Sequence, residues 1–191
     1  PLFADKPEHL IPHFGDYSKH KDLAIGVQRD IPTYKANRGE CYNLKIAQGT
    51  LTNEDRFKIN DHIVQTIQML NQLPYPKHLK SVPDIAGAHH ERLDGKGYPR
   101  QLAAEDIPLT ARILTIADIF EALTAADRPY KKAKSLDEAL GIMQQMAQSG
   151  HIDPELFALF LRTGVYLEYA QAYLPPEQQD DVDVNQMVAA L

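Results

Sequence analysis

The stretch that decides the fold class is ILTIADIFEAL, residues 113–123. It is apolar on nearly every side, and it belongs to a longer apolar segment, 109–126, that begins after Pro108. Proline is favoured at the start of a helix, so this segment predicts a helix. The segments around it show the same helical period, and short stretches rich in proline and glycine separate them. From residue 52 onward no strand-like alternation is long enough to propose a sheet, so the sequence predicts an all-α fold.

The starts of the neighbouring helices are well marked. Thr52-Asn53-Glu54-Asp55 resembles a capping box and predicts a helix over 53–72. The predicted inner face of this helix consists of Ile59, Ile63, Ile67 and Leu70. Ser81-Val82-Pro83-Asp84 predicts a shorter helix that carries His89 and His90.

Two more helices are expected towards the C-terminus. Ser135 begins a capping box, and Gly150 marks the end of the helix that follows. Its apolar positions are Leu136, Ala139, Leu140, Met143 and Met146. Asp153-Pro154 begins the last long helix, whose predicted inner face is Leu156, Phe157, Phe160 and Leu161.

Changes in composition divide the chain into three parts. Residues 1–48 are rich in turn-forming residues and predict an arm of loops and short helices. Residues 49–175 form the predicted helical domain. Residues 176–191 begin with an acidic run, and they predict a solvated tail with a weak helix over 186–191.

Composition excludes several classes of protein. The 191 residues carry a net charge of −6, which argues against DNA binding. The 43% of hydrophobic residues argues against disorder of the whole chain. No apolar run has the length of a membrane span and no leader is visible, so we expect a cytoplasmic protein without a membrane partner. Cys41 is the only cysteine, so a metal site must be built from histidine and carboxylate ligands.

Asp118 is the sharpest anomaly, because it interrupts the apolar stretch 113–123. Removing an unpaired carboxylate from water costs several kcal/mol in a real protein. Asp118 therefore needs a metal ion, a cation or a set of hydrogen-bond donors. A buried salt bridge or a cap on a neighbouring helix is the alternative. The metal hypothesis predicts that His62, His89 and Asp118 converge on one point.

Adjacent histidines are the second anomaly. His89 and His90 precede Glu91, and the loop Asp94-Gly95-Lys96-Gly97-Tyr98-Pro99 follows them. Neighbouring positions on a helix diverge by about 100°, so the two rings suit two neighbouring ions or one site completed by other helices. The loop offers backbone donors, a lysine and an aromatic face to a phosphate ester that carries a base. Ordinary surface or core histidines and an ordinary turn are the alternatives.

Three further residues complete the candidates. His62 lies at the border of the apolar stripe of its predicted helix, where a boundary histidine with a purely structural role is the alternative. Arg128 and Lys131 follow the helix of Asp118 and could present cations to whatever that residue helps to bind. A charged helix end is the alternative interpretation of both.

Together these motifs resemble the signature blocks of the bacterial HD-GYP family, over residues 49–165. The blocks are Gly49-Thr50-Leu51-Thr52 with His62, the run from His89 to Pro99, Ile116–Thr124, and Asp127-Arg128-Pro129-Tyr130-Lys131. The resemblance implies an HD-superfamily helical bundle that hydrolyses cyclic di-GMP with one to three iron or manganese ions. It also implies that His62, His89, His90 and Asp118 bind metal, that Gly97, Tyr98 and Pro99 line the site, and that Arg128 and Lys131 contact substrate phosphates.

The chain departs from the family pattern at the residues that give the family its name. No His-Asp pair occurs in the sequence, and the stretch where it is expected begins Arg29-Asp30-Ile31. Asp30 is a candidate remnant, and His9, His13 and His20 are candidates for the ligands of the family's earlier helix. Family members use the pair to bridge two ions.

The resemblance with this departure leaves two main hypotheses. One is a metal-dependent cyclic di-GMP phosphodiesterase in bacterial signalling. The other is a catalytically degenerate relative that binds a ligand or a signalling protein as its output. A third hypothesis, an HD-superfamily phosphohydrolase that acts on other nucleotides, fits the Gly97-Tyr98-Pro99 block less well.

Overall fold

The computed structural model describes residues 4–13, 25–47, 49, 51–125 and 133–191, which fall into two compact units. Unit 1 comprises residues 1–83 together with the short segment 98–100. Unit 2 comprises residues 84–97 and 101–191. The chain therefore leaves unit 1, enters unit 2, returns for three residues and ends in unit 2.

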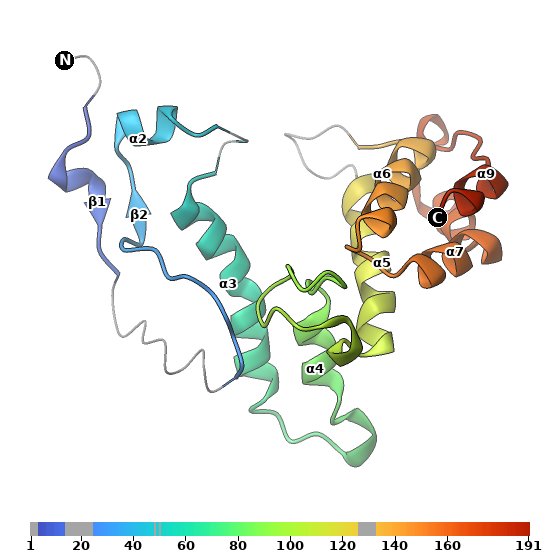
Figure 1. Ribbon diagram of the computed structural model, residues 1–191, viewed down its shortest axis with the longest axis horizontal. Coiled ribbons are helices and arrows are strands. Elements are labelled where there is room, and N and C mark those ends of the chain that lie inside the picture. The colour runs from blue at the N-terminus through green and yellow to red at the C-terminus, as the bar shows by residue number, and fades with distance from the viewer. Residues whose placement is uncertain (1–3, 14–24, 48, 50, 126–132) are drawn as a thin grey trace. The chain divides into compact units, whose positions relative to one another are not determined.

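Short elements make up the first part of unit 1 (Figure 1). A 3₁₀ turn over Pro7–His9 leads into strand β1, Leu10–Ile11, which pairs antiparallel with β2, Ala36–Asn37. Helix α2, Glu40–Leu44, follows directly. The predicted arm of loops and short helices is thus present, and the two-residue pairing is too short to leave an alternating pattern in the sequence.

Helix α3, Asn53–Leu70, is the main element of unit 1. The predicted capping box is confirmed, since the Thr52 hydroxyl accepts from the Asp55 backbone N–H and the Asp55 carboxylate accepts from the Thr52 backbone N–H. Ile63 and Ile67 are buried as predicted, and Val64 lies beside them. The prediction for Ile59 is wrong, because its side chain is 52% exposed and the buried stripe begins one turn later.

The segment Tyr98–Arg100 completes the small core of unit 1. Tyr98 packs against the hydrophobic cluster of Val27, Ile63, Val64 and Ile67. The Pro99 carbonyl accepts from the Gln28 backbone N–H at 2.7 Å, and Arg100 Nε donates to the Ile25 carbonyl at 3.1 Å. Three residues distant in sequence thus supply one side of this core.

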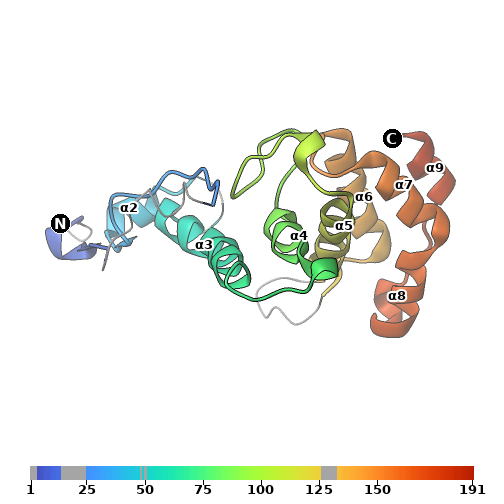
Figure 2. The ribbon, with the colours of Figure 1, turned by 90° about the horizontal axis from the view of Figure 1, so that it is seen from below.

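Unit 2 begins within helix α4, Val82–Ala88, at Asp84, and continues with α5, Leu109–Thr124 (Figures 1 and 2). Ala88 of α4 packs with Ile107 and Ala111 in one small apolar cluster. Helix α5 begins after Pro108 as predicted. Its burial is one-sided, with Ile116 and Phe120 in the core while Leu109, Ile113 and Leu114 are exposed.

The main core of unit 2 lies between α5, α6 (Leu136–Gln148) and α7 (Pro154–Thr163). Its fully buried side chains are Leu136, Leu140, Met143, Ile152, Phe157 and Leu161. Ser135 caps α6 and Asp153 caps α7, as predicted. The last long helix is interrupted at Gly164, whose φ of 73° ends α7, and α8 follows over Val165–Tyr173.

The C-terminal segment is packed against unit 2, so the prediction of a solvated tail is wrong. A 3₁₀ turn over Pro176–Gln178 precedes α9, Val184–Ala189. Val182, Val184, Met187 and Val188 pack against the main core, and Gln178 is buried. The segment is rich in carboxylates, but apolar and amide side chains lie between them in the sequence. The apolar and amide side chains make the contacts with unit 2.

The fold class is all-α, as predicted, with the β1–β2 pair as a minor addition. Within the described ranges, no helix combines the length and the apolar character needed to cross a bilayer. The predicted division at residues 48 and 175 stays a prediction.

Candidate metal centre

His62 lies on the exposed side of α3 in unit 1. Its Nδ1 is 2.6 Å from the carbonyl oxygen of Ile59, one turn earlier. A carbonyl oxygen only accepts hydrogen bonds, so Nδ1 carries the proton. Nε2 is then the ring nitrogen that can offer a lone pair to a cation.

His89 is held in the same way in unit 2. Its Nδ1 is 2.6 Å from the carbonyl oxygen of Ala86, so Nε2 is the nitrogen that can offer a lone pair to a cation. A hydrogen bond from the far ring nitrogen to a backbone carbonyl is the usual arrangement for a metal-binding histidine, because it fixes the tautomer and the ring orientation. His62 and His89 therefore share one geometry, and it is a geometry suited to metal binding.

His90 lies beside His89. The prediction that both residues are on a helix is wrong. Helix α4 ends at Ala88, and both histidines lie in the turn that follows. Outside the helical repeat the two rings come together, with centroids 4.1 Å apart and planes inclined at 44°. The turn thus removes the divergence expected of adjacent helix positions.

Thr115 on α5 fixes the backbone of this turn. Its hydroxyl is buried and donates to the His89 carbonyl oxygen at 2.8 Å. Asp118 lies three residues further along the same helix, so it is on the same side of α5 as Thr115. The helix that carries Asp118 is therefore tied directly to the turn that carries the histidines.

Asp118 itself is exposed, so the argument from burial was wrong. Its neighbours in sequence are mostly apolar, but Asp118 lies in an exposed position, so the carboxylate is not withdrawn from water. Exposure leaves its oxygens accessible to a cation. Its role as a ligand stays a prediction, now supported by its place on α5 rather than by a desolvation cost.

Glu91 is buried and stabilises the loop that follows the histidine turn. It is 2% exposed, and its Oε2 accepts from the Leu102 backbone N–H at 3.0 Å. That bond joins the two residues that flank segment 92–101. Gly97 lies against the backbone of Glu91 and Arg92 so closely that any Cβ at this position would overlap it.

The Gly97-Tyr98-Pro99 stretch packs against other parts of the protein. Gly97 and Pro99 are buried, and Tyr98 is half-buried against the core of unit 1. Their predicted role in lining a substrate site therefore depends on the path they give to the backbone, and it stays a prediction.

Charged groups brace the same loop. Arg92 makes a two-pronged ion pair with Asp94, at 3.0 and 2.6 Å, and the Lys96 backbone N–H donates to Asp94 at 3.0 Å. Burial would raise the pKa of Asp94, but these donors outweigh it and lower the pKa. Burial lowers the pKa of His151, and the nearby Arg92 lowers it further.

The other candidates divide into described and undescribed residues. Arg128, Lys131 and His20 lie outside the described residues. His9 lies in the first 3₁₀ turn, and its Nδ1 is 3.3 Å from the Lys6 backbone nitrogen. His13 Nε2 is 2.9 Å from the Pro32 carbonyl oxygen, and Asp30 is exposed.

Sequence reasoning missed the residues that hold the candidates in place. Glu91 occurs inside one motif block and Thr115 directly precedes another, but their role comes from hydrogen bonds to backbone groups distant in sequence. The signal available for Thr115 was a polar residue in an apolar helix, the same signal that singled out Asp118.

The family model for the HD domain matches residues 3–156, most of the chain. The chain belongs to the HD domain family. Its match begins in the arm and runs through α3, the histidine turn, α5 and α6 into the start of α7, so the predicted family is confirmed.

Curated relatives are named for cyclic dinucleotides. The chain is 44% identical over 111 residues to 3′3′-cGAMP-specific phosphodiesterase 3 of Vibrio cholerae, 58% of this chain and 23% of the relative. It is 49% identical over 85 residues to a cyclic di-GMP phosphodiesterase response regulator of Xanthomonas campestris, 44% of this chain and 22% of the relative. A cyclic di-GMP phosphodiesterase of Thermotoga maritima is 36% identical over 115 residues, 60% of this chain and 30% of the relative. The chain thus spans less than a third of the length of these relatives.

Proposed function

We propose that the chain is the metal-binding part of a phosphodiesterase that cleaves a cyclic dinucleotide in bacterial signalling. The observation that carries the proposal is the common geometry of His62 and His89, each with Nδ1 hydrogen-bonded to a carbonyl oxygen three residues back, a partner of the kind that fixes the ring of a metal-binding histidine.

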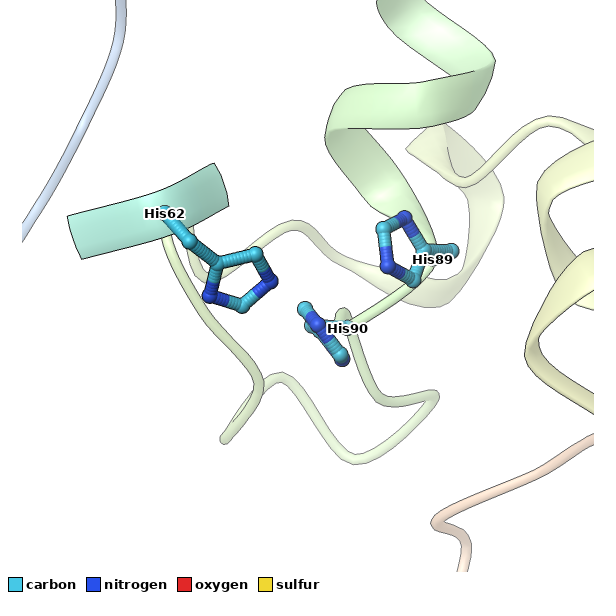
Figure 3. A group of neighbouring side chains, drawn as sticks. All are labelled: His62, His89 and His90. Carbon is cyan, nitrogen blue, oxygen red and sulfur yellow. The ribbon is translucent and has the colours of Figure 1, made fainter. Parts of the chain in front are cut away.

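The proposed ligands are His62, His89 and His90, joined by Asp118. We propose that these three histidines, which Figure 3 draws, each offer one ring nitrogen to the same ion. His62 belongs to unit 1 and the other two to unit 2, so a shared ion is part of the proposal. Imidazole with carboxylate suits iron and manganese, the metals we propose.

A divalent ion at these ligands would supply charge neutralisation at the phosphodiester and a more acidic water. The chain's own residues have separate tasks. Thr115 and the carbonyls of Ile59 and Ala86 orient the ligands. We propose that Arg128 and Lys131 bind the phosphate oxygens, as the resemblance implies, and that Gly97, Tyr98 and Pro99 set the edge of the site.

Cyclic di-GMP is the proposed substrate, with 3′3′-cGAMP as the second candidate. The second candidate is favoured by the 44% identity to a relative named for that nucleotide. Both molecules carry two phosphodiesters, so phosphate binding does not separate them. The two nucleotides differ in the edges of one base. Calorimetry with both therefore shows which of them the chain binds more tightly.

The degenerate hypothesis shares the same ligands but not the chemistry. Without the His-Asp pair, four ligands from His62, His89, His90 and Asp118 suffice for one ion, whereas a two-ion site needs more. Under this hypothesis the chain binds the nucleotide or a signalling protein but does not hydrolyse the nucleotide.

Metal analysis of chain purified without chelator tests the proposed centre. His62→Ala and His89→Ala should each reduce bound iron or manganese about tenfold or more, because each removes one of four ligands. His78→Ala is the matched control, since His78 is an exposed histidine in the turn Lys77–Leu79. Equal metal content in all three variants would overturn the proposal.

Nucleotide binding tests the phosphate contacts separately. Arg128→Ala and Lys131→Ala should each weaken cyclic di-GMP binding by about 1.5 to 3 kcal/mol, the value of a charge-assisted hydrogen bond. The helix content and melting temperature should stay the same. Calorimetry that gives the parent affinity for both variants would remove these two residues from the site.

A further inference from the structure

A cavity of about 300 Å³ lies in unit 2, between α6 and the C-terminal segment that ends in α9. Helix α6 supplies Asp137, Gly141 and Gln144, and the C-terminal segment supplies Asp183, Gln186 and Met187. Gln144 Nε2 donates to the Met187 carbonyl oxygen at 2.8 Å, so a hydrogen bond joins the two walls. The volume is of the order found for ligand sites in proteins, and the described residues that line the cavity include none of the proposed metal ligands.

Gly141 keeps one wall of the cavity open. It lies in the interior of α6, where glycine stabilises a helix less than alanine does. A Cβ at this position would meet nothing within 4 Å, so close packing does not require glycine here. The absence of a side chain at residue 141 therefore leaves space on the cavity side of α6.

The carboxylates of Asp137 and Asp183 give the cavity its charge. Both residues are exposed, and the described lining residues include no lysine, arginine or histidine. Within the described ranges neither carboxylate forms an ion pair. The Asp180 carboxylate adds a third negative charge nearby, because it accepts from the Asp137 backbone N–H at 3.0 Å. The cavity therefore favours a cation.

We propose that this cavity binds an arginine side chain of a partner protein. A guanidinium group presents five N–H donors in a planar fork, which suits two carboxylates better than a single ammonium does. The methylene groups of arginine suit the apolar wall that Met187 and Gly141 provide. The site is separate from the metal centre, so the inference goes beyond the proposed function and does not depend on catalysis.

The amides of Gln144 and Gln186 favour a peptide over a free organic cation such as a polyamine. A side-chain amide carries N–H donors as well as a carbonyl acceptor. A polyamine brings donors only, whereas a peptide backbone brings carbonyl oxygens and N–H groups. Gln186 is exposed at the cavity, so its amide is accessible to the backbone on either side of a bound arginine.

An NMR titration of the whole chain, labelled with nitrogen-15, tests the class of ligand. The probe is the acetylated and amidated tripeptide alanine-arginine-alanine. The control tripeptide carries citrulline, which has the shape of arginine without its charge. We expect the arginine peptide to shift the amide signals of residues 137–144 and 183–190 and to bind about fivefold more tightly than the control, because exposed ion pairs each contribute little. Equal binding of the two peptides, or no shift in these ranges, would overturn the proposal.

Butylguanidine distinguishes a protein partner from a free cation. It has the charge and the guanidinium group of arginine but no peptide groups. We expect it to bind about threefold or more weakly than the arginine peptide, because it offers no carbonyl oxygen to the two amides. Equal or tighter binding of butylguanidine would assign the cavity to a small organic cation and overturn the assignment to a protein.

Loss of each carboxylate tests the location of the bound peptide. Asp137→Asn and Asp183→Asn should each weaken binding of the arginine peptide about twofold to fivefold. Asparagine still caps a helix, so α9 keeps its cap in the second variant. Asp181→Asn is the matched control, because Asp181 is an exposed carboxylate of the same segment that does not line the cavity. An equal loss in Asp181→Asn would attribute the binding to the general charge of the segment and overturn the site.

Filling the cavity gives a test that leaves its charge unchanged. Gly141→Leu should abolish binding of the arginine peptide, whereas Gly141→Ala should bind within about twofold of the parent. Leucine and alanine both form helices better than glycine, and circular dichroism checks that α6 is kept. Neither variant should change the bound iron or manganese. Unchanged peptide binding in Gly141→Leu would overturn the proposal, and it would leave the proposed metal centre unaffected.

Discussion

Gly97 shows how one residue determines the path of the loop after the histidine turn. A Cβ at this position would overlap the backbone of Glu91 and Arg92, and those atoms cannot move without disturbing the buried Glu91. Gly97→Ala should therefore lower the free energy of unfolding by about 1 to 3 kcal/mol, the usual cost of overpacking. Urea denaturation measures it.

The control for Gly97 is another glycine. Gly141 lies inside α6, and a Cβ there would meet nothing within 4 Å. Gly141→Ala should raise the free energy of unfolding by about 0.5 to 1 kcal/mol, because alanine is the better helix former. Similar stability changes in the two variants would show that the close approach at Gly97 is relaxed in solution.

The candidate ligands were predicted by two different arguments, one from motifs and one from the cost of burying a charge. His62 and His89 were identified by motif, and the structure adds the carbonyl partners that fix their tautomers. Those partners lie one turn back, so they follow once the local backbone is known. Asp118 was chosen for a desolvation cost that its exposed position removes. Burial depends on which elements pack on which face, and sequence period alone does not determine that.

At the scale of elements, Asp180 ties the C-terminal segment to the start of α6. Its carboxylate accepts from the Asp137 backbone N–H at 3.0 Å. Burial would raise the pKa of Asp180, but hydrogen bonds from Ser135 and from backbone N–H groups at the helix start lower it. An anion at this end also interacts favourably with the helix dipole.

Stability should depend on this contact in a pH-dependent way. A carboxylate whose pKa is lower in the folded chain stabilises the fold above its unfolded pKa of about 3.9, and loses that effect as pH falls through the folded value. Asp180→Asn should lower the free energy of unfolding at pH 7 by about 0.3 to 1 kcal/mol, a surface value that allows for screening. The difference from the parent should shrink below pH about 4.

Asp181→Asn is the control for Asp180, because Asp181 is a neighbouring exposed carboxylate. Chemical denaturation of the three chains at several pH values gives the comparison. A constant difference between parent and Asp180→Asn across this range would contradict a contact that depends on the charge.

The starts of elements were predicted better than their ends. Thr52, Ser135 and Asp153 accept backbone N–H groups as expected, because capping is a local interaction between residues two or three positions apart. The end of α4 and the break at Gly164 were missed. Both depend on tertiary contacts or on a single glycine within an otherwise helical pattern.

At the scale of the whole molecule, the missing His-Asp pair determines the expected activity. The single ion proposed at His62, His89, His90 and Asp118 would lack a second centre to stabilise the leaving oxygen. These 191 residues alone should hydrolyse cyclic di-GMP poorly or not at all in the presence of iron or manganese. Chromatography of the linear product measures turnover, with His89→Ala as the background.

Robust turnover that disappears in His89→Ala would contradict this expectation. It would show that another side chain of the arm replaces the missing ligands, with Asp30 and His20 the first to be substituted. Turnover that persists in His89→Ala would instead come from a contaminating enzyme.

The fold class followed from the sequence because the helical period recurs after residue 52 and several segments begin with capping residues. The assignment of Tyr98–Arg100 to unit 1 did not, because these three residues pack apart from their sequence neighbours. The docking of the C-terminal segment was missed for a similar reason. Its acidic composition indicates solvent, whereas its contacts come from Gln178, Met187 and the valines.

The return of Tyr98–Arg100 to unit 1 has a consequence for synthesis on the ribosome. Chains fold from the N-terminus as they emerge, at about 5 to 20 residues per second. Residues 53–70 emerge before Tyr98, so the Ile63 and Ile67 surface has no Tyr98 to cover it until residue 100 has left the exit tunnel. Unit 1 is therefore completed about 1.5 to 6 seconds after α3 is made, and during this interval its apolar face is open to chaperones.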